Sequence, residues 1–280
     1  MKDRSNELKT LFAAVATAAV AAAAIDAIFI EPACVEITRY PLPIPDLPAS
    51  WHGAKLVHLT DLHYGDPRSK ALFEWMVRTV NGWAPDLIVI TGDYVVSRSS
   101  EGVGAAKYLA QLQAKHGVVG VLGDHDFHLR TKKTVGGVVD RIRDSGVHLL
   151  RNEAIELPGG FRIAGIDPTT RKVQKADLKA ALEAVPGGQP HLLLSHAPDI
   201  ILEAAGHGIP MVLCGHTHGG QVVIPFYGPP ITHSTVGKEF ASGWSSLHDT
   251  RMYTGRGLAS HHSLRFCCRP EITLFTLEAA

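Results

Sequence analysis

The apolar and polar positions after residue 50 alternate between two patterns. Short apolar runs rich in β-branched residues predict buried strands at residues 55–60, 86–91, 117–122, 191–194 and 211–214. Elsewhere apolar residues recur every three or four positions, which predicts amphipathic helices at residues 69–83, 104–114, 134–145, 175–185 and 199–205. Further short runs, separated by turn residues, predict an antiparallel meander at residues 148–150, 154–157 and 161–164. This alternation of strands and helices indicates an α/β fold.

The beginning of the chain has a different pattern. An apolar, alanine-rich segment at residues 11–30 is interrupted only by Asp26, and it follows three basic side chains, Lys2, Arg4 and Lys9. As a helix it is long enough to cross a bilayer, so we predict a membrane anchor or a signal segment at residues 1–31. Cleavage near Ala22–Ala24 and a helix buried in the domain are the alternatives. Because basic residues stay on the cytoplasmic side, we expect the segment in the inner (cytoplasmic) membrane and the body outside the cytoplasm.

Proline dominates the segment that follows. Residues 32–50 include the run Pro-Leu-Pro-Ile-Pro at 41–45, which cannot continue a helix and lacks backbone donors. We predict a stiff connector over residues 32–50, with an edge strand at residues 35–40, and one domain at residues 51–280. Within that domain, residues 225–242 form a long irregular segment of a kind that often shapes a binding pocket.

Composition narrows the range of partners. The chain has 27 basic and 27 acidic residues, so no net positive field attracts nucleic acid, which we exclude as the preferred partner. The four cysteines show neither Cys-x-x-Cys spacing nor a disulfide framework. Histidine is unusually frequent, at 16 residues, and imidazole is a common metal ligand.

Aspartate and histidine residues follow five of the predicted strands directly. In an open α/β sheet ligands bind beyond the carboxyl ends of the strands, so these side chains would share one site. One such residue alone is usually a solvated loop charge or a hydrogen-bonded core histidine, but their recurrence favours a metal site. Asp66 and Arg68, beside the first motif, are further candidates for contact with a substrate. The main candidates are Asp61, His63, Asp93, Asp124, His125, Asp126, His196, His216 and His218.

The order of these motifs resembles that of the calcineurin-like metallophosphoesterases. The motifs are Asp-x-His, Gly-Asp, Gly-x-His-Asp, a single His and Gly-His-x-His, and the resemblance covers about residues 51–277. It is closest to the membrane-associated bacterial YkuE/YaeI-like branch, because of Gly-His-Thr-His-Gly-Gly-Gln at 215–221 and the ending Arg265, Phe266 and Pro-Glu-Ile at 270–272. The implied fold is metallo-dependent phosphatase-like: an αββα sandwich of two mixed β-sheets flanked by helices, here with an N-terminal hydrophobic helix.

The resemblance also implies two divalent metal ions, of manganese, zinc or iron. Attack on phosphorus would come from a water molecule that bridges the two ions. His125 would stabilise the transferring phosphoryl group or protonate the leaving oxygen, and Asp126 would orient the His125 ring. Asp61, His63 and His218 would bind one ion, Asp124, His196 and His216 the other, and Asp93 both.

The implied function is a metal-dependent hydrolase of a phosphoester or pyrophosphate bond. Membrane attachment favours an amphiphilic or envelope-related substrate, and the resembling branch suggests a UDP-2,3-diacylglucosamine pyrophosphatase of lipid A biosynthesis. That substrate conflicts with the expected orientation, since a nucleotide sugar is found in the cytoplasm. A body outside the cytoplasm fits a phospholipid or another envelope phosphoester better. The alternative class is a noncatalytic, membrane-tethered metal-binding scaffold with a degenerate site.

Asp124 is the position at which the chain departs from the family, which usually has asparagine there. Both side chains offer an oxygen to a metal ion, but the carboxylate adds a negative charge. We expect this charge to weaken the attraction of the site for a phosphate anion, to make the bridging water harder to deprotonate and to favour harder ions such as manganese.

Asp124→Asn is therefore predicted to raise the hydrolysis rate at the acidic end of the pH profile, because the water would lose its proton at a lower pH. The measurement is the rate as a function of pH for both proteins with the same metal. An identical rate and profile in the two proteins would contradict the prediction.

Overall fold

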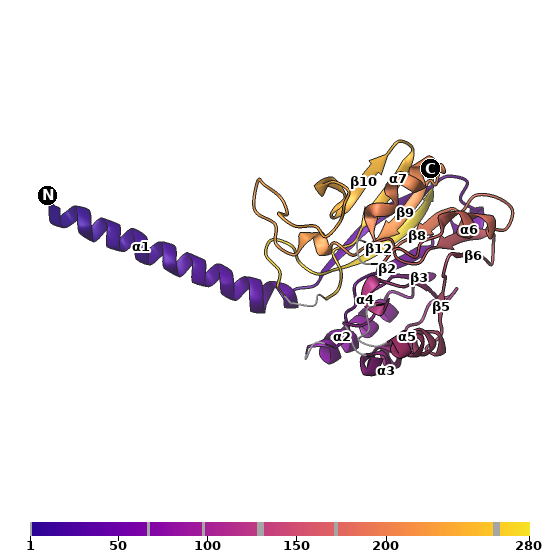
Figure 1. Cartoon of the computed structure of the whole chain (residues 1–280), viewed down its shortest axis with the longest axis horizontal. Helices are drawn as coiled ribbons and strands as arrows, with labels where there is room; N and C mark the ends of the chain where they lie inside the picture. Colours follow the sequence, from indigo (N-terminus) through magenta and orange to yellow (C-terminus); the bar gives the residue numbers. More distant parts are fainter. Residues whose placement is uncertain (1, 66–67, 97–98, 128–131, 171–172, 260–263) are drawn as a thin grey trace.

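Two mixed, six-stranded sheets pack face to face between layers of helices (Figure 1). The computed structural model describes residues 2–65, 68–96, 99–127, 132–170, 173–259 and 264–280. In sheet order, the first sheet consists of β1 (Glu36–Ile44), β12 (Glu271–Ala279), β2 (Lys55–Leu59), β3 (Leu87–Thr91), β4 (Val118–Val121) and β5 (Val147–Leu149). The second consists of β10 (Gly243–Leu247), β11 (Thr250–Thr254), β9 (Met211–Cys214), β8 (Leu192–Leu194), β7 (Phe161–Gly165) and β6 (Glu153–Leu157). The predicted αββα sandwich is confirmed.

The central strands are apolar along their whole length because both of their faces are buried. In β3, Leu87 and Val89 face the layer between the two sheets. Ile88 and Ile90 point the other way and pack against helices. Successive side chains of a strand alternate between faces, so a strand between two apolar layers needs an unbroken apolar run.

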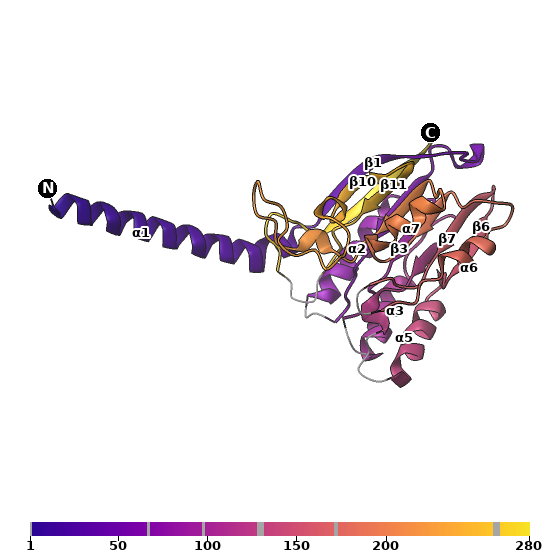
Figure 2. The ribbon, with the colours of Figure 1, turned by 45° about the horizontal axis from the view of Figure 1, so that its top comes forward.

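Helices cover the outer face of each sheet. The first sheet packs against α2 (Ser69–Gly82), α3 (Ser99–Leu109) and α5 (Lys132–Asp144), and Figure 2 shows α3 and α5 side by side. The second packs against α6 (Leu178–Glu183) and α7 (Ile201–Gly206). α6 is shorter than the helix predicted at residues 175–185. The Asp177 carboxylate accepts a hydrogen bond from Ala180 N and caps the helix, so the helix begins at Leu178.

The predicted antiparallel meander is wrong in its first strand. β6 and β7 pair antiparallel as expected. β5, however, pairs parallel with β4 at the edge of the first sheet. The chain crosses from one sheet to the other in the short turn between β5 and β6, so hydrophobic runs that are neighbours in sequence belong to different sheets.

Part of the predicted proline-rich connector belongs to the first sheet. The expected edge strand extends to Ile44 as β1 and pairs parallel with β12. Leu42 and Ile44 are fully buried between the sheets. Pro41 and Pro43 fit there because an edge strand leaves one row of backbone groups without a partner strand, where a missing donor is tolerated.

The N-terminal segment forms a long helix that projects from the body (Figure 1). α1 (Lys2–Ile25) continues through a π-helical turn, η1 (Asp26–Ile30), into the 3-10 turn η2 (Glu31–Ala33). Lys9–Ala33, 25 residues, is long and apolar enough to cross a membrane, and only 6% of its 18-residue apolar window is buried against the body. This exposure argues against a core helix of the domain and supports membrane association.

Candidate active site

The predicted site residues lie at the carboxyl ends of central strands from both sheets. Asp61, Asp93 and Asp124 follow β2, β3 and β4 of the first sheet, and His196 and His216 follow β8 and β9 of the second. Backbone bonds between the strand-end loops tie them together: Asp61 N donates to Gly92 O at 3.1 Å, and Gly215 N donates to His196 O at 2.8 Å. His216 N of the second sheet donates to Asp61 Oδ2 of the first at 3.0 Å, so the two sheets meet at one edge of the sandwich.

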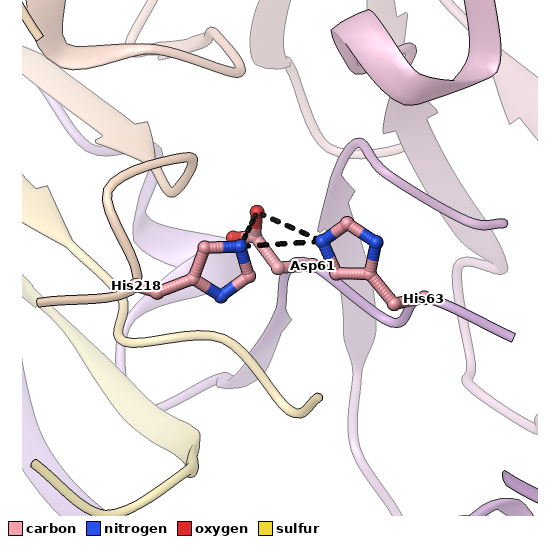
Figure 3. A group of neighbouring side chains, drawn as sticks. All are labelled: Asp61, His63 and His218. Carbon is pink, nitrogen blue, oxygen red and sulfur yellow. Dashed lines mark hydrogen bonds and ion pairs between the residues drawn. The ribbon is translucent and has the colours of Figure 1, made fainter. Parts of the chain in front are cut away.

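The first ligand set gathers around one point (Figure 3). The Nε2 atoms of His63 and His218 are 3.2 Å apart. Asp61 Oδ1 lies 3.5 Å from His218 Nε2 and 4.0 Å from His63 Nε2. All three side chains are buried.

The second ligand set has the same form. Asp124 Oδ1 lies 3.3 Å from His196 Nε2 and 3.2 Å from His216 Nδ1. The two imidazole nitrogens are themselves 3.1 Å apart. Asp124 and His196 are buried, whereas His216 is partly exposed at the mouth of the site.

Asp93 links the two sets through a single oxygen. Its Oδ2 atom lies 3.4 Å from His63 Nε2 in the first set and 3.5 Å from His196 Nε2 in the second. The other oxygen, Oδ1, accepts a hydrogen bond from His125 N at 2.9 Å, which fixes the carboxylate plane.

The geometry and the donor atoms fit divalent metal ions. Two nitrogens that bind one ion at ~2.1 Å in tetrahedral geometry are separated by ~3.4 Å, close to the spacing within each set. Asp61 Oδ1 and Asp124 Oδ1 are buried without a hydrogen-bond donor among the described residues, although a buried carboxylate oxygen is costly unless it is paired. A cation at each point would satisfy both oxygens.

Hydrogen bonds from neighbouring groups orient the proposed ligands toward the metal positions. Asp61 Oδ2 accepts hydrogen bonds from Thr60 Oγ1 at 2.7 Å and from His216 N at 3.0 Å, so Oδ1 is left for a metal ion. His196 Nδ1 donates to Thr91 O at 2.8 Å, which leaves the Nε2 lone pair directed at the centre. Such partners orient metal ligands and select the tautomer.

Burial sets the protonation of the first histidine pair. It lowers the pKa of His63 to about 3 and holds the pKa of His218 well below its usual value. Both rings are therefore neutral near pH 7, the form that binds a metal ion. Burial by itself would lower the pKa of His196, but the carboxylates of Asp93, Asp124 and Asp61 together outweigh burial and raise it. A cation between this ring and the carboxylates would displace its proton.

The site is built on strained backbone. Residues other than glycine rarely adopt a positive φ, and each such residue costs on the order of 1–3 kcal/mol. The left-handed residues of the site are Asp61 (φ 50°), His63 (43°), Asp93 (53°), His216 (69°) and His218 (51°). Gly215 permits the close approach of the loops, because a Cβ there would collide with the side chains of Thr60 and Asp61.

His125 lies beside the centre, but Asp126 has a role that differs from the prediction. The His125 ring stands edge-on to His63, with the centroids 4.8 Å apart, and its Nδ1 donates to Val96 O at 2.6 Å. The Asp126 carboxylate instead accepts hydrogen bonds from backbone amides, Tyr94 N at 3.0 Å and Gly123 N at 2.8 Å. The Val96 carbonyl therefore orients the His125 ring, and Asp126 braces the loops that carry Asp93 and Asp124.

Arg265 is a site residue whose role the sequence pattern missed. Its guanidinium is buried and donates to His218 O at 2.9 Å, Arg256 O at 2.7 Å and Ala259 O at 2.9 Å. Residues 265–268 thereby hold the loop of the Gly-His-x-His motif from outside, and the Cys268 thiol also donates to His218 O at 3.2 Å. A single arginine in an irregular segment gives no sequence signal of such contacts.

Of the two predicted substrate-contact residues, only Arg68 is among the described residues. Asp66 lies outside the described residues. Arg68 Nη1 lies 3.5 Å from Ile28 O, at the end of the N-terminal helix.

Known proteins match the chain over most of its length. The family model described as Calcineurin-like phosphoesterase matches residues 54–220. The uncharacterized metallophosphoesterase YkuE of Bacillus subtilis is 30% identical over 99% of this chain and 98% of its own. Phosphodiesterase YaeI of Escherichia coli is 30% identical over 99% of this chain and 100% of its own. UDP-2,3-diacylglucosamine pyrophosphatase LpxG of Chlamydia trachomatis is 26% identical over 92% of this chain and 93% of its own.

Arg265→Lys is predicted to weaken metal binding roughly 10-fold, as loss of a group that positions a metal ligand commonly does. A lysine ammonium cannot reproduce the planar fork that reaches several carbonyl groups at once. The measurement is the metal content of the purified protein across a series of free Mn²⁺ concentrations.

Arg269→Lys is the matched control, because Arg269 is exposed and should tolerate the same exchange. Equal Mn²⁺ affinity in the two variants would contradict a positioning role for Arg265.

Proposed function

Because the chain belongs to the calcineurin-like phosphoesterase family, and is thus a metal-dependent hydrolase of phosphoester bonds, we propose that it works with two metal ions held by the two ligand sets. The position of Asp93 Oδ2, 3.4 Å from His63 Nε2 and 3.5 Å from His196 Nε2, is the observation that carries the proposal. One oxygen within reach of both sets is what a bridging carboxylate requires.

The residues of the two sets would hold the ions as follows: Asp61, His63 and His218 the first, Asp124, His196 and His216 the second, and Asp93 both. Mixed carboxylate and imidazole ligands suit manganese, zinc or iron. When bound, two divalent ions supply neutralisation of the phosphoryl charge and activation of a water molecule. Three carboxylates leave the centre less positive than a site with asparagine at position 124.

His125 is proposed to transfer the proton to the leaving oxygen. Its Nδ1 is held by Val96 O, so Nε2 is the atom that can carry the transferred proton. Burial lowers the pKa of His125, but Asp93, the Val96 carbonyl, Asp124 and Asp126 together outweigh burial, and the net pKa is raised. A raised pKa keeps this ring protonated at higher pH, as a general acid requires.

The proposed substrate is an amphiphilic phosphoester or pyrophosphate. Two observations support it: the long exposed apolar helix at the N-terminus and the similarity to LpxG, whose name gives a lipid-linked nucleotide sugar as its substrate. UDP-2,3-diacylglucosamine is the specific candidate if the body is cytoplasmic. If the basic N-terminus holds the body outside the cytoplasm, a phospholipid or another envelope phosphoester is the candidate.

The full-length protein with Mn²⁺ is expected to hydrolyse at least one member of a panel of esters. The panel contains p-nitrophenyl phosphate, its bis ester, a phospholipid and UDP-2,3-diacylglucosamine. His216→Ala should reduce turnover to background because it removes a proposed metal ligand. His207→Ala, at an exposed histidine that ends α7, should leave turnover unchanged.

Metal-loaded protein that turns over no member of the panel would favour the noncatalytic scaffold instead. Equal turnover in the two alanine variants would reject the proposed ligand set.

His125→Ala is predicted to lower kcat by about 10²–10⁴ for an alkyl phosphoester, because a poor leaving group needs its proton. The loss should be much smaller for p-nitrophenyl esters, whose leaving group departs as a stable anion. The measurement is kcat for both ester types with the same metal. An equal loss with both would assign His125 to binding of the phosphoryl group.

A further inference from the structure

The segment that follows the Gly-His-x-His motif carries an exposed apolar tip. This tip, residues 224–231, exposes the side chains of Ile224 (44%), Phe226 (111%), Tyr227 (64%) and Ile231 (61%). Soluble domains rarely leave so many large apolar side chains together in water, since each exposed Å² of apolar surface costs about 25 cal/mol. Such a patch indicates a partner surface.

The base of the tip is firmly held on both sides. Phe266 N donates to Gln221 O at 2.9 Å, and Val223 N donates to Phe266 O at 2.9 Å, so an isolated parallel β-bridge joins the start of the segment to residue 266. After the tip, Ser234 Oγ and Thr235 N each donate to the Asp199 carboxylate at 2.8 Å. The apolar side chains are therefore presented from a fixed base, close to His196 and His218.

The same C-terminal segment joins the tip to the end of the N-terminal helix. Arg265 N donates to Ala27 O at 2.9 Å. The buried Glu31 carboxylate accepts hydrogen bonds from Cys267 N, at 2.8 Å, and from Cys268 N. Residues 265–268 thus lie between the helix end and the tip, with hydrogen bonds to both.

The helix end and the tip lie toward the same side of the body. Ile28, Phe29 and Ile30, in the last turn of the apolar helix, are 43%, 66% and 52% exposed. In both ribbon views an orange loop between β9 and β10 extends from the body toward the side on which α1 leaves it (Figures 1 and 2). The tip and the exposed end of the N-terminal helix therefore face the same side of the body.

We propose that residues 224–231 insert into the surface of the bilayer that α1 crosses and thereby press the mouth of the active site against the lipid. The composition fits that surface: aromatic rings and aliphatic side chains enter the boundary between head groups and acyl chains, and lysine reaches the phosphates. Lys238 Nζ lies 3.9 Å from the centroid of the Tyr227 ring, at the edge of the tip. The inference rests on the membrane attachment proposed for α1.

The insertion places lipid next to the proposed ligands. Gly220 follows His218 by two residues, and a Cβ on Gly220 would collide with Pro229 of the tip. The tip thus packs directly on the histidine loop. A phosphoester whose acyl chains stay in the bilayer would then have its phosphate group next to the proposed metal ligands.

Tryptophan at position 226 can test the insertion in the full-length protein. The protein is reconstituted into phosphatidylcholine–phosphatidylglycerol vesicles, with or without bromine on the acyl chains, and the wild-type fluorescence is subtracted. The tryptophan of Phe226→Trp should be quenched by bromine atoms placed near the head groups. Its emission maximum should lie at a shorter wavelength than that of a tryptophan exposed to water. Val15→Trp in α1 is the positive control, and Leu202→Trp, 66% exposed on α7, is the negative control.

The outcomes separate the inference from its premises. If Val15→Trp is quenched and Phe226→Trp behaves like Leu202→Trp, the tip does not insert and the inference is overturned. If Val15→Trp is not quenched, membrane attachment by α1 fails and the inference fails with it. A Phe226→Trp blue shift that depends on protein concentration, without quenching, would show a second copy covering the tip and would also overturn it. None of these readouts requires turnover, so they do not depend on the proposed hydrolysis.

Discussion

The packing of one sheet on the other is the constraint on which the site depends. The carboxylates Asp61, Asp93 and Asp124 come from the first sheet, whereas His196, His216 and His218 come from the second. Each proposed metal position needs ligands from both sheets, so neither sheet can form a position alone. The apolar layer between the sheets, which is nearly free of solvent, therefore fixes the distances between carboxylate and imidazole. A shift of one sheet against the other by about 1 Å would disrupt both positions.

Burial of this apolar layer also has to offset the free-energy cost of the active site. Buried carboxylates, neutral buried imidazoles and several left-handed residues are crowded into one edge of the sandwich. Backbone amides and carbonyls offset part of this cost, through Asp126, Thr91 and Arg265. The rest is offset by apolar burial elsewhere and, in our proposal, by metal binding. A domain with this balance should gain stability from its metal ions as well as reactivity.

The fold and the order of the site motifs could be predicted from the sequence, because both depend on local patterns of residues. Apolar runs mark strands with two buried faces, and the motif at each strand end identifies the family. The nine main candidates do lie together, although their assignment as ligands stays a prediction. Hydrogen bonds between segments far apart in the sequence could not be predicted in this way. The sheet to which β5 belongs, the pairing of β1 with β12 and the roles of Arg265 and Glu31 depend on partners far away in sequence, and no periodicity encodes these partners.

The position of β12 in the first sheet constrains the order in which the chain folds. The last strand of the polypeptide, Glu271–Ala279, lies between β1 and β2, the first two strands. Until β12 is in place, the sheet has a gap, and β1 has no neighbour to pair with. Contacts of such long sequence separation form late, because most of the chain must be ordered to close them. β1 can therefore join the first sheet only after β12 has taken its place between β1 and β2, so this edge of the sheet is completed late in folding.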